Sequence, residues 1–372
     1  MLLFAKQTNT QMQKKIYSVI RGSGKYIPTQ IIPNHYFLNS EFYDEQGTEI
    51  ASNQQEIINK FEKITGIKER RYVTVDLVAS DIGYFAAKDA LESSGIDPES
   101  LDYIIFAHNF GDITASNKHT DIVPSLASRV KHKLEIINPK TIAYDLPFGC
   151  PGWVQGMIQA DYFLKSGDAK RALVIGADTL SRICDPHDRD SMIYADGAGA
   201  TIIEAVESEY PVGILTHNTR SDTIEHAFEL WMDDSYNPKY SGNEVYLKMY
   251  GRKLYNYALT HVPQTVKDSI DKAGLRIEDI DKILIHQANE KMDEAIIQRL
   301  FKLYGMKSYP KEKVPMTISW LGNSSVATVP TLLDLILKGE MDGQQINPGN
   351  QVVFASVGAG LNINSIVYKF PE

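Results

Sequence analysis

Three residues far apart in the chain have side chains that could carry out acyl transfer together: Cys150, His286 and Asn323. A cysteine thiolate can attack a thioester carbonyl and hold the acyl group as a new thioester. An imidazole N–H and an amide N–H can then stabilise the negative charge that develops on the carbonyl oxygen of a second thioester. No one of these residue types is specific alone, so the prediction depends on their meeting in one pocket.

Cys150 lies in the turn Phe148-Gly-Cys-Pro-Gly-Trp153, between a predicted strand at 141–146 and a predicted helix at 153–165. Proline suits the first helical position, where its missing N–H costs nothing, so we place Cys150 at the helix N-cap. The unpaired amides and the dipole of a helix start stabilise a thiolate, and we therefore expect a lowered cysteine pKa. The alternative is a buried cysteine that packs as a small apolar side chain.

The other two residues also stand at the ends of predicted elements. His286 follows a predicted strand at 282–285, and the carboxyl ends of strands are where α/β proteins bind ligands. His108 lies near the corresponding point of the first half of the chain. Asn323 precedes a predicted helix, and because asparagine is a favoured N-cap, a purely structural role for it stays open.

The chain contains two similar halves. Segment 88–106 matches segment 267–285 in its charged residues, its glycine and its apolar positions, and each copy predicts a helix, a turn and a buried strand. Alternating helices and apolar strands indicate an α/β fold. The duplication indicates that the halves, 16–205 and 206–372, are related by a pseudo-twofold axis.

A second repeat concerns the candidate site itself. Gly149-Cys150 aligns with Gly322-Asn323, and each pair is followed by a predicted helix and then a strand. Under a pseudo-twofold, the two helix starts become symmetry mates. We therefore expect Cys150 and Asn323 to approach each other in one pocket.

Composition bounds the class of protein. Among 372 residues, acidic side chains outnumber basic ones by 47 to 38, and the net charge of −9 argues against a partner such as nucleic acid or an anionic membrane. No run of about 18 apolar residues predicts a membrane span. Two cysteines without metal-type spacing favour a reduced, cytoplasmic setting and a structural role for Cys184. Residues 1–15 are predicted to be a disordered leader, and Met12 could be the natural start.

Several motifs, in their order and spacing, resemble those of the β-ketoacyl-acyl-carrier-protein synthase III family of the thiolase superfamily. The resemblance covers nearly the whole chain, from Ile16 to Phe370. The motifs that carry it are Ile64-Thr-Gly-Ile-Lys-Glu-Arg-Arg71, Gly149-Cys-Pro-Gly152, Gly176-Ala-Asp-Thr-Leu-Ser-Arg182, Cys184-Asp-Pro-His-Asp-Arg189, Ala195-Asp-Gly-Ala-Gly-Ala200, His286-Gln-Ala-Asn289, Gly322-Asn-Ser-Ser325 and Gly358-Ala-Gly360.

The resemblance implies a five-layered thiolase-like fold, a homodimer, and roles for the candidate residues. It implies that Cys150 is the acylated nucleophile and that His286 and Asn323 bind the carbonyl group of the second thioester. The backbone N–H groups of Cys150 and Ala359 become the oxyanion hole. It implies no metal and no permanently bound cofactor, because the substrates arrive as phosphopantetheine thioesters on coenzyme A or acyl carrier protein.

The chain departs from the family where acyl-CoA is bound. Arg189 matches an arginine that holds adenine, but the tryptophan that faces it is absent near Lys60, and Ile64 replaces an arginine. Lys291 lies where a basic residue can meet a phosphate or an acidic carrier protein. Val123 occupies a loop position that reaches the partner subunit's pocket, where many members have a bulky aromatic residue, so we expect room for a longer acyl chain.

Two flanking segments are expected to shape the pocket, 39–55 over its entrance and 228–257 along its wall. The leading interpretation is a decarboxylative Claisen condensation with a malonyl thioester. Two alternatives stay open. The first is a non-decarboxylative ketosynthase or acyltransferase of a pyrone-, olefin- or resorcinol-type pathway. The second is a catalytically silent subunit that binds carrier protein, which the intact Cys150, His286 and Asn323 argue against.

Overall fold

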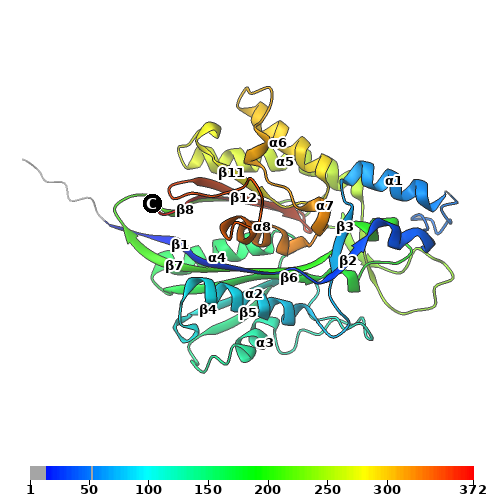
Figure 1. Ribbon diagram of the computed structural model, residues 1–372, viewed down its shortest axis with the longest axis horizontal. Coiled ribbons are helices and arrows are strands. Elements are labelled where there is room, and N and C mark those ends of the chain that lie inside the picture. The colour runs from blue at the N-terminus through cyan, green and yellow to red at the C-terminus, as the bar shows by residue number, and fades with distance from the viewer. Residues whose placement is uncertain (1–13, 52) are drawn as a thin grey trace, which may run out of the picture.

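The computed structural model describes residues 14–51 and 53–372, in which helical layers alternate with two sheets (Figure 1). The five layers are an outer helical layer, a five-stranded sheet, a central helical layer, a four-stranded sheet and a second outer helical layer. This arrangement agrees with the α/β fold expected from the sequence pattern and with the five layers implied by the family resemblance.

The first sheet has the strand order β1-β7-β6-β4-β5. β4 pairs in parallel with β5 and β6, whereas β7 is antiparallel to both β6 and β1. Helices α2 and α3 cover its outer face with apolar side chains, which explains why β4 and β6 are buried almost throughout. The elements are β1 (Lys15–Tyr26), β4 (Tyr103–His108), β5 (Ile142–Pro147), β6 (Arg171–Thr179), β7 (Asp196–Ser208), α2 (Ala79–Ser94) and α3 (Leu126–Lys133).

The second sheet has the order β11-β12-β13-β8 and repeats this pairing pattern. β11 is parallel to β12, and the β12–β13 and β13–β8 pairs are antiparallel. Helices α5 and α6 cover its outer face. The elements are β8 (Gly213–Ser221), β11 (Lys282–Ile285), β12 (Gln351–Gly358), β13 (Asn362–Lys369), α5 (Gly251–Lys272) and α6 (Glu290–Leu303).

Helices α4 (Gly152–Ser166) and α8 (Thr328–Leu337) form the central layer between the sheets (Figure 1). Their apolar side chains contribute to one buried cluster with residues of both sheets. Trp153 of α4 packs edge-on against Phe354 of β12, with ring centroids 5.6 Å apart. A helix that is apolar around most of its circumference must be buried on both sides, as α8 is. The two helices that follow Cys150 and Asn323 therefore share one core.

The remaining elements lie at the end of the molecule that carries the site. They are β2 (Gln30–Pro33), β3 (Glu69–Tyr72), α1 (Gln54–Thr65), β9 (Leu230–Asp233), β10 (Tyr246–Met249) and α7 (Ile318–Leu321), with 3₁₀ turns between them. β2 pairs with β3, and β9 pairs with β10, as separate two-stranded ribbons. Among the described helices, none is long and apolar enough to cross a membrane.

The first strand differs from the prediction at its start. It begins at Lys15 rather than after it, so the predicted leader at 1–15 overlaps it by one residue. Residues 1–13 lie outside the described part of the chain, and Met12 with them. The predicted boundary between halves at 205 and 206 falls inside β7, whose last residue is Ser208, and the second sheet begins at Gly213.

Candidate active site

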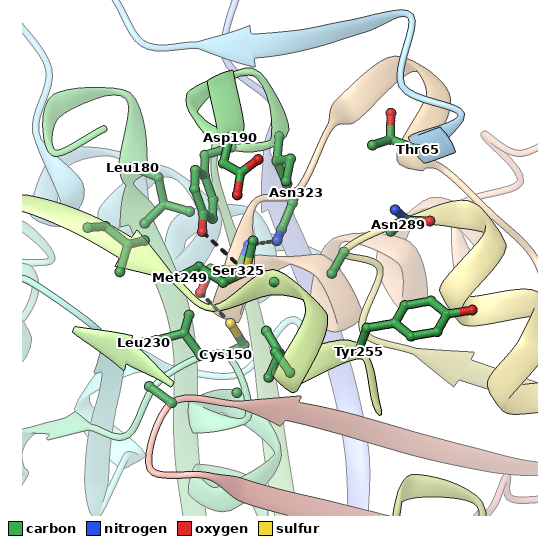
Figure 2. Close-up of a pocket in the computed structure, with 18 of the residues that line it drawn as sticks. Thr65, Cys150, Leu180, Asp190, Leu230, Met249, Tyr255, Asn289, Asn323 and Ser325 are labelled. Carbon is green, nitrogen blue, oxygen red and sulfur yellow. Dashed lines mark hydrogen bonds between the residues drawn. The ribbon is translucent and has the colours of Figure 1, made fainter. Parts of the chain in front are cut away.

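Cys150, His286 and Asn323 all line one cavity of about 1050 Å³. Cys150 comes from the first half of the chain and the other two come from the second. Figure 2 shows Cys150 and Asn323 facing the same space, with Ser325 between them. The structure therefore brings together the three residues that the sequence singled out, as the expected convergence of the two helix starts requires.

Cys150 lies in the turn between β5 and α4, one residue further from the helix than predicted. The helix begins at Gly152 with Pro151 at the N-cap, so Cys150 is not the N-cap itself and proline is not the first helical residue. A hydrogen bond of 2.9 Å from the Gly152 amide to the Gly149 carbonyl closes the turn, and Gly149 has a φ of 72°. This left-handed conformation favours glycine.

The loop after β12 lies directly against this turn. A Cβ added at Gly358 would stand 2.8 Å from both the backbone nitrogen and the Cβ of Cys150, so only glycine fits there. One residue on, Ala359 also lines the cavity. Among residues 14–51 and 53–372, the amides of Cys150 and Ala359 donate no hydrogen bond to another residue. The Ala359 nitrogen lies close to this turn, 3.1 Å from the position that a Cβ on Gly149 would occupy.

The pKa of Cys150 is shifted in the direction opposite to the prediction. Burial raises the thiol pKa to about 11, and the negative charge of Asp178 acts in the same direction. The hydrogen bond from Ser325 opposes both effects. The predicted lowering considered the helix start alone, whereas the loss of water around the sulfur is the larger effect because it penalises the charged thiolate.

His286 follows β11 directly, as predicted, and its backbone N–H donates a 2.8 Å hydrogen bond to the carbonyl of Ala355 on β12. The side chain is buried. Burial lowers the pKa of His286 to about 4, against a smaller opposing contribution from the backbone of Ser325. The imidazole is therefore neutral at pH 7, where one ring nitrogen donates and the other accepts.

Asn323 does not begin a helix as predicted. It follows the short helix α7 and precedes a 3₁₀ turn at Ser325–Ala327 that leads into α8. Its backbone is held on both sides, by the carbonyl of Ile193 at 3.0 Å and by the amide of Ala195 at 2.8 Å. Its Oδ1 accepts a 2.8 Å hydrogen bond from the Ser325 amide, which leaves Nδ2 as the donor end of the amide.

The glycine before Asn323 explains why the segment bends here. Gly322 has a φ of 70°, and a Cβ at that position would lie 2.6 Å from the Cβ of Arg70. Arg70 is fully buried and donates hydrogen bonds to the Ile32 carbonyl and to Oδ1 of Asn34, at 3.0 and 2.6 Å. The motif that contains Arg70 thus supports the asparagine from behind.

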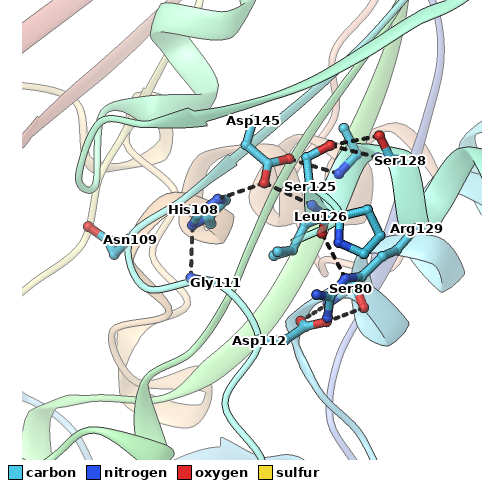
Figure 3. A network of polar contacts seen from close by, with 12 residues as sticks. Ser80, His108, Asn109, Gly111, Asp112, Ser125, Leu126, Ser128, Arg129 and Asp145 are labelled. Carbon is cyan, nitrogen blue, oxygen red and sulfur yellow. Dashed lines mark hydrogen bonds and ion pairs between the residues drawn. The ribbon is translucent and has the colours of Figure 1, made fainter. Parts of the chain in front are cut away.

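Sequence reasoning gave no role to three polar residues beside Cys150. Ser325 Oγ donates a 3.2 Å hydrogen bond to Cys150 Sγ (Figure 2). Asn109 Nδ2 donates to the same Oγ at 2.9 Å and to Asp178 Oδ2 at 2.5 Å. Ser325 and Asp178 lie inside motifs that resemble those of the family, which was the available signal. Asn109 follows β4 directly, in a loop without such a motif (Figure 3).

The predicted substrate-binding residues separate into two groups. Arg189 lines the cavity, and so do Lys60 and Ile64 of helix α1, where the family's tryptophan and arginine are missing. Lys291 is exposed in the first turn of α6 and is not among the residues that line the cavity. Val123 is 82% exposed and likewise stands outside the cavity of its own chain.

The predicted wall segment borders the cavity, whereas the predicted cover contributes little. Apolar side chains from β9, β10 and the start of α5 form one side of the cavity: Leu230, Trp231, Met232, Leu247, Met249, Leu254 and Tyr255. From the described part of 39–55, Ile50 is the residue that lines it. No group of three or more His, Cys, Asp or Glu side chains in the described ranges is arranged to hold a metal ion.

A five-layered α/β fold with a cysteine, a histidine and an asparagine in one cavity defines a class, the condensing enzymes of the thiolase superfamily. Comparisons with known proteins agree. The family model for 3-oxoacyl-[acyl-carrier-protein] synthase III matches residues 144–223, and the model for its C-terminal part matches residues 270–370.

Relatives match over nearly the full length. The β-ketoacyl-[acyl-carrier-protein] synthase III of Erythrobacter litoralis is 31% identical over 95% of this chain and 100% of its own. Synthase III 1 of Vibrio vulnificus is 33% identical with the same coverage. The solved synthase III of Thermus thermophilus is 29% identical, with a TM-score of 0.78 over 95% of this chain and 99% of that one. The chain belongs to the β-ketoacyl-[acyl-carrier-protein] synthase III family, and it is an acyl-thioester condensing enzyme.

Proposed function

We propose that the protein transfers an acyl group from a phosphopantetheine thioester to Cys150 and then condenses it with a malonyl-carrier-protein thioester. The products are a β-ketoacyl thioester and carbon dioxide. The observation that carries this proposal is that Cys150, His286 and Asn323 meet in one large, mainly apolar cavity. The relatives' names specify an acyl carrier protein, and we extend that partner to this chain.

In the first step, the Cys150 thiolate attacks the carbonyl carbon of the donor thioester. The carbon–sulfur bond to the donor breaks, and the donor sulfur leaves as a thiolate that takes up the proton given up by Cys150. The amides of Cys150 and Ala359 would receive the oxyanion of the tetrahedral intermediate. Neither amide donates a hydrogen bond to another described residue, and the Ala359 nitrogen lies against the turn that holds Cys150, which supports that role.

In the second step, the malonyl carboxylate leaves as carbon dioxide and its bonding electrons form an enolate. We assign the enolate oxygen to the neutral imidazole of His286 and to Nδ2 of Asn323. The enolate carbon then attacks the acyl carbonyl, and Cys150 leaves as a thiolate. A neutral donor suits this step because its burial in an apolar wall is far less costly than that of a charged imidazolium.

The carrier arm would enter past the polar residues of the cavity. We propose that Arg189, which is exposed and also lines the cavity, and Lys291, which is exposed on α6, meet the phosphate or the acidic carrier protein. Without the tryptophan near Lys60, an acyl-carrier-protein donor is favoured over acyl-CoA. We propose no metal and no permanently bound cofactor.

We also propose a homodimer of pseudo-twofold subunits, each with halves at 16–205 and 206–372. β5 pairs with β4 on one side, and no other described strand pairs with its second edge. Ile142 on this strand is 50% exposed, and Val123 projects from a nearby loop with 82% exposure. An apolar, unpaired edge strand is a natural pairing surface for a second copy. Val123 would then reach the partner's pocket and leave room there for a long acyl chain.

The test is intact-mass analysis after incubation with acyl thioesters of several chain lengths, on coenzyme A and on carrier protein. We expect one acyl adduct on the natural chain and none on Cys150→Ala. The adduct should be unchanged on Cys184→Ala, because Cys184 is buried and its thiol donates a hydrogen bond to the Leu180 carbonyl. An adduct that survives Cys150→Ala would contradict the proposal. Release of carbon dioxide from malonyl-carrier protein separates the decarboxylative reaction from a non-decarboxylative ketosynthase.

A further inference from the structure

Next to Cys150, three polar side chains from distant parts of the sequence form a hydrogen-bond network. Asp178 stands near the end of β6, Asn109 directly after β4, and Ser325 in the turn before α8. Asp178 and Ser325 are buried, with 2% and 4% of their surfaces exposed. A polar network at this depth is stable only if its members satisfy one another.

Asn109 occupies both oxygens of the Asp178 carboxylate. Its backbone N–H donates to Oδ1 at 2.9 Å, and its Nδ2 donates to Oδ2 at 2.5 Å. The same Nδ2 donates its other hydrogen to Ser325 Oγ at 2.9 Å. Because the carboxylate accepts only, the contact fixes which end of the Asn109 side chain is the NH₂ group.

The single hydroxyl hydrogen of Ser325 has two acceptors within reach, Cys150 Sγ and the Asp178 carboxylate. Oγ already accepts from Asn109, so its own O–H is free to donate, and Cys150 Sγ lies 3.2 Å away. The backbone of Ser325 has a φ of 53°, an uncommon conformation for a residue other than glycine. Such strain persists only where the surroundings enforce it, and it is often found at functional sites.

We propose that Ser325 is a catalytic residue that donates a hydrogen bond to the Cys150 thiolate, and that Asn109 and Asp178 are positioning residues that hold the Ser325 hydroxyl in this orientation. The proposal rests on the proposed role of Cys150 as the nucleophile. A thiolate accepts a hydrogen bond more strongly than a thiol does, so the interaction favours the reactive form.

This hydrogen-bond network offsets an unfavourable effect of the groups that surround the sulfur. The titratable groups near it are Asp178, Tyr194 and His286, and of these Asp178 disfavours the thiolate through its charge. Without Asn109, the Ser325 hydroxyl could turn to that carboxylate and leave the sulfur without a donor. With Asn109 in place, each carboxylate oxygen already accepts an N–H donor, so Asp178, which also lies within reach of the Ser325 hydroxyl, competes less with Cys150 for its hydrogen.

The experiment measures the rate of Cys150 alkylation by iodoacetamide against pH, on the full-length protein without any acyl substrate. For Ser325→Ala we expect an apparent thiol pKa about one unit higher, and alkylation at neutral pH about tenfold slower. Ser325→Gly should behave alike, because glycine suits the φ of 53° and removes the hydroxyl without backbone strain. Ser324→Ala is the matched control, since its hydroxyl pairs with Thr328 at 3.3 Å and should leave the profile unchanged.

A double-variant comparison tests the positioning residues. Asn109→Leu should raise the thiol pKa in the natural protein and have no further effect in the Ser325→Ala background, because Asn109 acts through that hydroxyl. A superimposable pH profile for Ser325→Ala and the natural protein would overturn the proposal, as would an additive effect of the two substitutions. Circular dichroism of each variant identifies any that fail to fold, and the conservative Ser325→Gly then decides the outcome. Alkylation needs no condensation, so this test can fail while the proposed reaction stands.

Discussion

At the scale of single residues, burial controls the protonation of Cys150 and His286, the two ionisable side chains among the three central residues. It raises the pKa of Cys150 to about 11 and lowers the pKa of His286 to about 4. Both shifts favour the neutral form, because a charge loses its hydration in the cavity wall. The hydrogen bond from Ser325 acts against this shift at Cys150, because it lowers the thiol pKa.

The lowered pKa of His286 predicts a pH dependence of stability. Below its ordinary pKa of 6.5, the unfolded chain binds a proton that the folded chain accepts only near pH 4. The free energy of unfolding therefore falls as the pH drops from about 6.5 to about 4, by roughly 3 kcal/mol from this residue. Urea unfolding of the natural protein and of His286→Asn at pH values across this window measures the contribution.

The comparison with the variant is needed because other buried groups act in the opposite direction. Burial raises the pKa values of Asp178 and Asp196 to about 6. The folded chain then holds protons that the unfolded chain has lost, so these two groups stabilise the fold as the pH falls through 6. An equal acid dependence in the natural protein and in His286→Asn would contradict the assignment to His286.

At the scale of elements, the ribbon β9–β10 forms a cavity wall and is anchored by a buried ion pair. Nζ of Lys248 on β10 lies 2.5 Å from Oδ2 of Asp185, and both side chains are fully buried. Asp185 also accepts hydrogen bonds from Ser235 Oγ and the Tyr236 amide, at 2.9 and 2.8 Å. The neighbours of Lys248 on the strand, Leu247 and Met249, line the cavity.

Removal of one partner of this pair leaves an unpaired buried charge. We expect Lys248→Met to lower the free energy of unfolding by about 3–5 kcal/mol, measured by urea denaturation. The double variant Lys248→Met/Asp185→Asn should be more stable than Lys248→Met alone, because no charge stays unpaired. If the losses of unfolding free energy in Lys248→Met and in Asp185→Asn add up to the loss in the double variant, the two side chains do not act as a pair.

At the scale of the whole molecule, the exposed second edge of β5 predicts association. Sedimentation velocity should give twice the mass of one chain for the natural protein. Ile142→Lys places a charge on the 50% exposed edge residue and should shift the equilibrium toward the single chain. Ile224→Lys is a matched control, because Ile224 is 99% exposed and lies in a different part of the fold. A monomeric natural protein, or equal effects of the two substitutions, would contradict the predicted dimer.

The sequence by itself indicated an α/β fold with two similar halves and singled out the three central residues, whereas the five layers were implied by the family resemblance. The repeat of 88–106 in 267–285 placed the strands that end near His108 and before His286, and an apolar run at 141–146 placed the strand before Cys150. The structure has a strand at each of these places. These are local properties, since a strand or helix is specified by neighbouring residues and by one buried face. The meeting of Cys150, His286 and Asn323 in one cavity was an expectation from the duplication, and the tertiary structure was needed to establish it.

Only the tertiary structure decided how the site is tuned. The sequence predicted a lowered pKa for Cys150 from its helix start, whereas the packing of both sheets around α4 removes water and raises it. Likewise, Asn109 meets Ser325 because the end of β4 faces the turn before α8 across the central layer. Desolvation and long-range hydrogen bonds depend on residues that are hundreds of positions apart, and no local pattern encodes such distances.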